Sequence, residues 1–81
     1  MTVVVHLFAG LRDATRRDRI VIETDDHVTA ADLIASVARE IPAAADLVHA
    51  FRLAVDDAYV GGDHVVTADC RCDLIPPVSG G

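Results

Sequence analysis

The chain has 81 residues and a formal net charge of −6, so it has the size of one small domain with an acidic surface. This charge argues against nucleic acid as a partner, because phosphate binding needs a basic surface. No apolar run approaches the roughly 20 residues that cross a bilayer, and the start lacks the basic segment of a signal peptide, so we expect a cytoplasmic protein without a membrane partner.

The first predicted elements are two strands. Residues 3–9 are β-branched and apolar, as in a central strand, and residues 19–24 resume this pattern after a break of charged residues and glycine at 10–18. The two runs predict a β-hairpin. We interpret His6 as a partly exposed strand residue, because no cysteine or carboxylate lies at ligand spacing from it. Alternation places Val3, Val5 and Leu7 on one face and Val4, His6 and Phe8 on the other.

A helix is predicted next. The segment Thr29-Ala30-Ala31-Asp32 resembles a capping box with Asp in place of Glu. Apolar residues then recur at helical spacing up to Ile41, and Pro42 ends the helix. Residues 43–50 are rich in alanine and form either a short second helix or a turn.

Three further strands are predicted in the second half. Residues 51–55 alternate as a strand, Asp56-Asp57 forms a turn, and residues 58–60 form a short return strand. Gly61-Gly62-Asp63 turns the chain again. Residues 72–75 form the last strand.

Two cysteines, Cys70 and Cys72, lie close to the last strand. At this spacing their Cα atoms lie near the upper limit for a disulfide, so we expect free thiols. His64 and Asp69 complete no recognised ligand spacing with them, and we expect no metal site.

The last six residues form a distinctive end, made of Pro76, Pro77, Val78, Ser79, Gly80 and Gly81. Two consecutive prolines favour a stiff, extended arm that projects by roughly 20 Å. The terminal diglycine has no side chains and fits a narrow channel, so the Gly81 carboxylate is the candidate for chemistry. The ordinary alternative is a frayed chain end.

The order strand, strand, helix, strand, short strand, strand predicts an α+β domain with one main helix across one face of a mixed sheet. This is the order of a β-grasp, ubiquitin-like fold. We assign residues 1–75 to this domain and 76–81 to an extended reactive tail.

Over its whole length the chain resembles the small, sulfur-carrying subunit of molybdopterin synthase, of the MoaD/ThiS-like β-grasp family. The resemblance rests on Phe8-Ala9-Gly10-Leu11-Arg12-Asp13, on Ala54-Val55-Asp56 and above all on the ending Pro76 to Gly81. The chain departs from the family at residues 68–71, where an acidic, glycine-containing turn is expected, so the geometry of that turn stays open.

The resemblance implies a sulfur carrier that is not an enzyme on its own. An E1-like activating enzyme would use ATP to adenylate the Gly81 carboxylate, and sulfur would then replace AMP to give a thiocarboxylate. The large subunit of molybdopterin synthase would use this group to sulfurate cyclic pyranopterin monophosphate in molybdenum cofactor biosynthesis. The chain itself would bind no cofactor, and its sequence contains no P-loop or nucleophile and base motif.

A docking surface for the large subunit is expected on the sheet face opposite the helix. Its candidates are Phe8, Ile75 and Tyr59, with Arg12 as a charged contact at the rim. The alternative is that Phe8 and Tyr59 complete a small core.

Two other functions remain open from the sequence. One is a sulfur carrier for thiazole or cysteine synthesis, which the proline pair disfavours. The other is a ubiquitin-like protein modifier whose Gly81 forms isopeptide bonds with lysines of other proteins.

Overall fold

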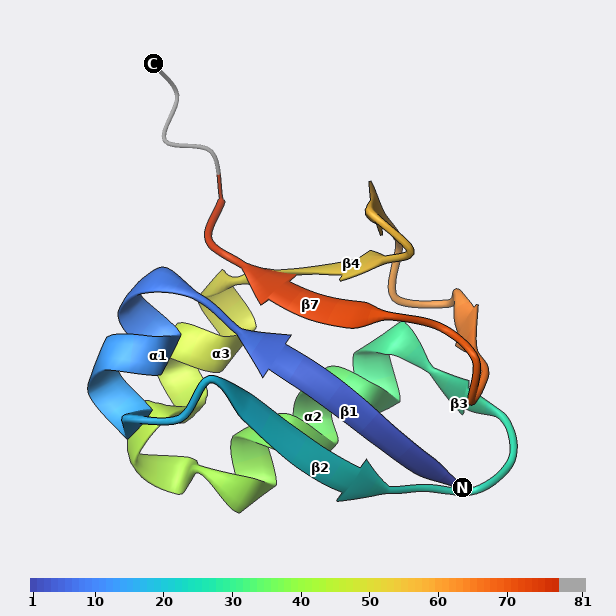
Figure 1. Ribbon diagram of the computed structural model, residues 1–81, viewed down its shortest axis with the longest axis horizontal. Helices are drawn as coiled ribbons and strands as arrows, with labels where there is room; N and C mark the ends of the chain where they lie inside the picture. The colour runs from blue at the N-terminus through green and yellow to red at the C-terminus, as the bar shows by residue number, and fades with distance from the viewer. Residues whose placement is uncertain (78–81) are drawn as a thin grey trace.

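A five-stranded mixed sheet organises residues 1–77, the part of the chain that the computed structural model describes (Figure 1). Its strand order is β2-β1-β7-β4-β5. Strands β1 and β7 run parallel, and the other neighbours are antiparallel. The strands are β1 (Thr2–Leu7), β2 (Arg19–Glu23), β4 (Arg52–Val55), β5 (Ala58–Tyr59) and β7 (Cys72–Ile75).

Strand β1 has the two faces that its sequence predicts. Val3, Val5 and Leu7 are buried, whereas Val4 is exposed and His6 is half-buried. The strand lies between β2 and β7, so both of its edges are paired. The interior position of this strand is therefore confirmed.

The connection between β1 and β2 corrects the predicted hairpin. The two strands pair antiparallel as expected, but helix α1 (Ala9–Thr15) joins them in place of a turn. This helix has one fully buried residue, Leu11, and the backbone N–H of Arg16 closes its end by donating to the carbonyl of Arg12 at 2.8 Å. A seven-residue helix with Leu11 as its one buried residue shows no helical periodicity in the sequence. This explains why the glycine and charged residues of this segment indicated a loop.

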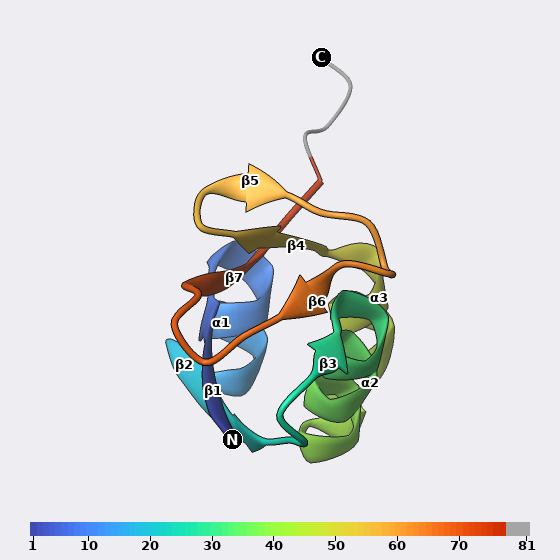
Figure 2. The ribbon, with the colours of Figure 1, turned by 90° about the vertical axis from the view of Figure 1, so that its right-hand side faces the viewer.

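Helix α2 (Ala30–Glu40) covers one face of the sheet, as predicted (Figure 2). The Thr29 hydroxyl caps it by accepting a hydrogen bond from the Asp32 backbone N–H at 3.2 Å. A 3-10 turn, η1 (Pro42–Ala44), and a short helix, α3 (Ala45–Ala50), follow. The alternative of a short second helix after Pro42 is thus confirmed. The buried residues of α2 are Ala30, Leu33, Val37 and Ala38.

A second, two-stranded sheet was not predicted. Strand β3 (Val28–Thr29) pairs antiparallel with β6 (Val65–Val66) just before α2 begins. The backbone N–H groups of Ala30 and Ala31 donate to the carbonyls of His64 and Gly62, respectively, at 2.8 and 2.9 Å. Two-residue strands are too short to show alternation, so only the tertiary pairing reveals them.

The core between sheet and helices is almost wholly aliphatic. Phe51 is its one buried aromatic residue, and Leu7, Leu11, Leu33 and Leu74 are among its largest fully buried side chains. No helix of the described chain is long and apolar enough to cross a membrane. The predicted α+β arrangement, with helices on one face of a mixed sheet, is present.

Candidate functional site

The candidate site begins where strand β7 ends. Ile75 is the last residue of β7, Pro76 is half-buried and Pro77 is exposed. In Figure 1 the described chain turns away from the sheet after β7. The remaining predicted tail residues, Val78, Ser79, Gly80 and Gly81, lie outside the described residues.

Parallel pairing brings Phe8 to the same edge of the sheet as Ile75. The register places Leu7 opposite Leu74, so Phe8 and Ile75 are the next residues on two neighbouring strands that run in one direction. Both side chains are half-buried, and neither belongs to the core cluster nor to the apolar residues packed against it. Two apolar side chains outside the core therefore lie at the root of the predicted tail.

Tyr59 joins Ile75 on the outer face of the sheet. The register pairs Ala54 with Tyr59 and Arg52 with Ile75, so these four positions have the same orientation in the pleat. Tyr59 and Ile75 line a hollow of about 180 Å³ together with Ala54 and Asp57. The Tyr59 side chain is 44% exposed, so it is available to a partner.

The β4–β5 turn determines this arrangement. Asp56 and Asp57 have φ angles of 50° and 70°, the left-handed conformation of a two-residue hairpin turn. The Asp56 carboxylate also accepts a hydrogen bond from the Arg71 backbone N–H at 2.9 Å.

The turn before β7 is the one whose geometry the sequence left open. The Cys70 N–H donates to the Thr67 carbonyl at 3.2 Å. A tight turn therefore stands where the acidic turn of the family was expected.

Arg12 lies in a different hollow from Tyr59 and Ile75. It is exposed on α1 and lines a depression of about 590 Å³ with Asp18 and three other arginines, Arg16, Arg17 and Arg19. The structure therefore brings Phe8 and Ile75 to one end of the sheet, places Tyr59 beside Ile75 in the hollow on the outer face, and leaves Arg12 in a separate basic cluster.

Two residues near the site were missed by the sequence reasoning. Arg52 lies over the Tyr59 ring, and Asp73 is a buried carboxylate on the outer face of β7. The Arg71 Nε donates to both Asp73 carboxylate oxygens at 3.2 and 3.3 Å. Strand alternation alone places Asp73 and Ile75 on one face, so the signal was present in the sequence.

Both cysteines are free thiols, as predicted. Cys72 is fully buried in the core, and this burial is the main cause that raises the pKa of its thiol to about 11, with smaller contributions from Cys70, Asp73 and Asp56. A thiol that stays protonated is a poor nucleophile. Cys72 is therefore a packing residue.

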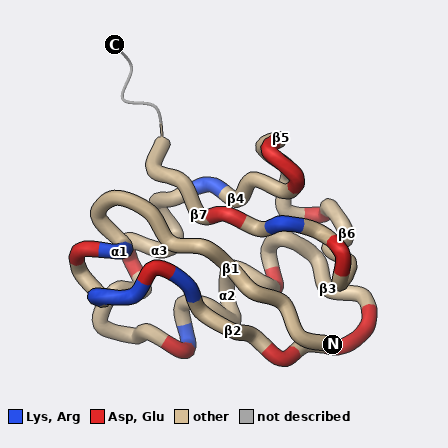
Figure 3. The backbone as a smooth tube through the Cα atoms, viewed as in Figure 1, with Lys and Arg blue, Asp and Glu red and all other residues tan. Residues whose placement is uncertain are grey.

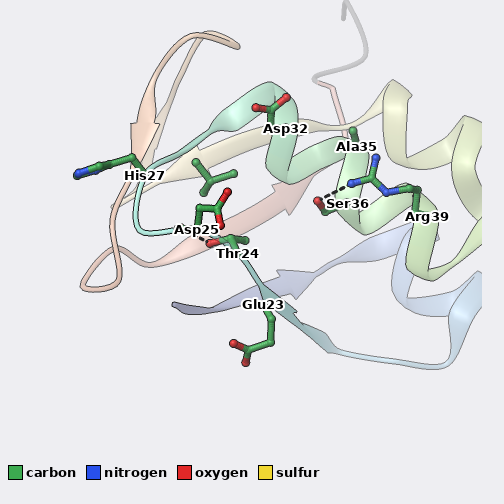
Figure 4. Close-up of a pocket in the computed structure, with 9 residues that line it drawn as sticks. Glu23, Thr24, Asp25, His27, Asp32, Ala35, Ser36 and Arg39 are labelled. Atoms are coloured by element: carbon green, nitrogen blue, oxygen red, sulfur yellow. Dashed lines mark hydrogen bonds between the residues drawn. The ribbon is translucent and has the colours of Figure 1, made fainter.

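A further depression of about 560 Å³ lies between the end of β2 and helix α2 (Figure 4). Its polar side chains do not converge, since Glu23 and His27 point away from its centre, and Arg39 donates to the Ser36 hydroxyl at 3.1 Å. Within residues 1–77 no group of three or more His, Cys, Asp or Glu side chains is arranged to hold a metal ion.

Comparisons with known proteins agree on family and fold. The profile of the ThiS family matches residues 5–81, while the search of curated proteins finds no match. Among solved structures, the chain is similar to SAMP1 from Haloferax volcanii, with 20% identity, a TM-score of 0.85 and 100% of both chains covered.

Two further structures carry molybdopterin-related names. A putative molybdopterin converting factor, subunit 1, from Pyrococcus furiosus is 23% identical with a TM-score of 0.82, over 96% of this chain and 99% of that chain. A chain from the complex of subunits 1 and 2 of molybdopterin-converting factor from Helicobacter pylori is 20% identical with a TM-score of 0.69, over 100% of both chains. These likenesses establish the β-grasp fold. Since the family profile spans nearly the whole sequence, the chain belongs to the ThiS family of sulfur carriers.

Proposed function

We propose that this chain is the sulfur-carrier small subunit of molybdopterin synthase. The observation that supports this most is the sequence Pro76 to Gly81, which follows β7 directly at the end of the sheet where Phe8 and Ile75 lie, beside the hollow that Ile75 lines with Tyr59. The converting-factor subunits of Pyrococcus furiosus and Helicobacter pylori share the fold that presents this end.

The proposed chemistry takes place at the Gly81 carboxylate. A carboxylate is a poor electrophile, so an E1-like enzyme joins it to the α-phosphate of ATP and releases pyrophosphate, which gives an acyl-adenylate. A sulfur nucleophile then attacks the acyl carbon and AMP leaves, which gives a thiocarboxylate on Gly81.

Transfer then restores the original carboxylate. In the active site of the large subunit, the thiocarboxylate sulfur attacks a carbon of cyclic pyranopterin monophosphate and forms a C–S bond, while a C–O bond at that carbon breaks and its oxygen leaves with the electron pair. Water attacks the acyl carbon, the bond between that carbon and sulfur breaks, and sulfur stays on the pterin. The catalytic groups belong to the partners, and this chain contributes the reactive end and its presentation.

The residues at the root of the tail explain how presentation is achieved. Phe8, Ile75 and Tyr59 form an apolar docking surface outside the core, and Arg12 offers a cation to an acidic contact on the large subunit or the activating enzyme. Pro76 and Pro77 restrict the backbone of the tail, which lowers the ordering cost of each insertion into the large subunit.

A reconstituted synthase assay tests this function. Deleting Gly81, or adding one residue after it, is expected to abolish sulfur transfer and to leave the circular dichroism spectrum and melting temperature unchanged. The matched control is Ser79→Ala, which keeps the terminal acyl group. Full transfer by either Gly81 variant would rule out the mechanism.

A protein modifier is the second candidate function. It is favoured by the likeness to SAMP1, which shares the fold over the whole chain, and SAMP1 denotes a small archaeal modifier protein. In that case activated Gly81 would form isopeptide bonds with lysines of other proteins. The sequence contains no lysine, so copies of such a modifier could not be linked to one another through lysine side chains.

A further inference from the structure

Strand β2 forms one free edge of the five-stranded sheet (Figure 1). Among residues 1–77 its only strand partner is β1, and it is five residues long, compared with two residues for β5 at the other edge. It carries no proline, one of the features that block pairing at an edge. An edge of this kind is a template for another strand.

The hydrogen bonds to β1 show which backbone groups of β2 are free. Thr24 N–H donates to the Met1 carbonyl at 2.8 Å, and Leu7 N–H donates to the Asp18 carbonyl at 2.9 Å. Hydrogen-bonded residues alternate along an antiparallel strand, so residues 18, 20, 22 and 24 face β1. Arg19, Val21 and Glu23 therefore direct their N–H and C=O groups away from the sheet.

The side chains of the same three residues are exposed. Val21 is 55% exposed and is the most exposed large apolar residue of the described chain. Its cross-strand neighbour Val4 is 36% exposed, so an apolar pair lies beside the free edge.

Most of the charges around Val21 form a mirror pattern of opposite signs; Asp18, whose mirror position is the uncharged Thr24, is the exception. Three arginines precede Val21 by five, four and two positions, and three acidic residues follow it by two, four and five positions. All six are exposed. Figure 3 shows basic residues at the start of β2 and acidic residues at and beyond its end. The mirrored pairs are Arg16 with Asp26, Arg17 with Asp25 and Arg19 with Glu23.

We propose that two copies of this chain associate through antiparallel pairing of their β2 strands, centred on Val21. In this register Val21 pairs with its symmetry mate, and Arg19 of each copy pairs with Glu23 of the other. Every outward backbone group of Arg19, Val21 and Glu23 gains a partner, and the two sheets become one continuous sheet.

The charge pattern selects this partner and this register. A second copy offers Glu23 opposite Arg19 within the paired strands, and its Asp25 and Asp26 follow its strand at the end where Arg16 and Arg17 precede this one. A parallel, in-register copy would place arginine against arginine. Shifting the antiparallel register by two residues leaves one outward residue of each strand without a partner. The contact lies across the sheet from β4 and β5, so the end of β7 stays free. The dimer therefore does not depend on the proposed function.

Sedimentation of the full chain over a concentration series tests the association. We expect a monomer–dimer equilibrium that weakens with salt, most of all near 1 M, where the Debye length is about 3 Å. Arg19→Glu and Glu23→Arg are each expected to weaken the dimer about tenfold, because each change occurs twice and turns an attraction into a repulsion. An equal mixture of the two variants regains opposite charges at both contacts, and its heterodimer is expected to match the original dimer.

Matched controls separate this contact from a general charge effect. Arg39→Glu and Glu40→Arg make the same charge changes on exposed positions of α2 and are expected to leave the dimer unchanged. Val21→Pro removes a backbone donor that points away from β1, so we expect loss of the dimer with the fold retained by circular dichroism. A chain that is monomeric at every concentration, or a dimer that survives Val21→Pro or is indifferent to both charge reversals, would overturn the proposal.

Discussion

The guanidinium carbon of Arg52 lies 4.6 Å from the centroid of the Tyr59 ring on the outer face of the sheet. The β4–β5 hairpin produces this stacking, because Tyr59 pairs with Ala54, two residues from Arg52 on the same face. Arg52 in turn is the cross-strand partner of Ile75. The cation therefore links the two apolar candidates for docking and holds the tyrosine ring beside the strand from which the tail leaves.

Removing this cation is expected to affect binding more than folding. In Arg52→Met the apolar stem remains but the cation–π contact is lost, so we expect less than about 1 kcal/mol of lost stability. The affinity for the large subunit should fall because Tyr59 is no longer held in place. Arg39→Met is the control, and titration calorimetry with the large subunit is the measurement. Unchanged affinity in Arg52→Met would show that the stacking has no role in docking.

The docking role of Phe8 and Ile75 is tested by comparing affinity with stability. Phe8→Ala and Ile75→Asp should weaken binding of the large subunit by about tenfold or more, as expected for residues near the centre of an interface, with small changes in melting temperature. Leu74→Ala is the opposite control, because Leu74 is fully buried and its loss should cost about 2 to 5 kcal/mol of stability. If Phe8→Ala destabilises the fold as much as Leu74→Ala does, Phe8 belongs to the core.

The Thr29 cap is expected to stabilise α2 by about 1 kcal/mol. Thr29→Ala removes the acceptor of the Asp32 N–H, whereas Thr29→Ser keeps it, so the serine variant serves as the matched control. Urea unfolding of the three proteins measures the difference. Equal losses in both variants would assign the effect of Thr29 to its pairing with Val65 in the small sheet and not to the cap.

Alkaline pH is expected to destabilise the fold through Cys72. Burial raises the pKa of this thiol from 9.0 to about 11, so the folded state holds the proton more tightly than the unfolded state. The resulting stability is fully present below pH 9.0 and is lost as pH rises through about 11. At about 1.4 kcal/mol per pKa unit, the loss across these two units amounts to roughly 3 kcal/mol.

Urea unfolding as a function of pH measures this loss. The matched variant is Cys72→Ala, which has no thiol at this position and should show a shallower decline across the same pH window. Parallel declines in both proteins would remove Cys72 as the cause.

Much of the fold could be predicted because its main elements carry strong local signals. The alternation in β1, the Thr29 cap and the Pro42 stop each determine a local structure regardless of the rest of the chain. Helix α1 and the β3–β6 pair lacked such signals. Leu11 is a single apolar anchor, and two-residue strands such as Val65–Val66 become visible only through long-range pairing.

The candidate site was predicted in part, for a related reason. The family resemblance placed Phe8 and Ile75 on one surface. In the structure each of them follows one residue of the parallel pair Leu7 and Leu74. The pairing of Tyr59 with Ala54 follows from a two-residue turn at Asp56 and Asp57. The position of Arg12 among other arginines depends on α1, which the sequence did not reveal.

The central claim, a sulfur carrier that works through Gly81, is tested most directly by the intact mass of the chain. After incubation with an E1-like activating enzyme, ATP and a sulfur source, a sulfur carrier should give a species heavier by the replacement of one oxygen with sulfur. Adding large subunit and cyclic pyranopterin monophosphate should return the original mass. A chain found mainly in larger adducts, with Gly81 in isopeptide linkage and no thiocarboxylate detectable, would rule out a sulfur carrier and identify a protein modifier.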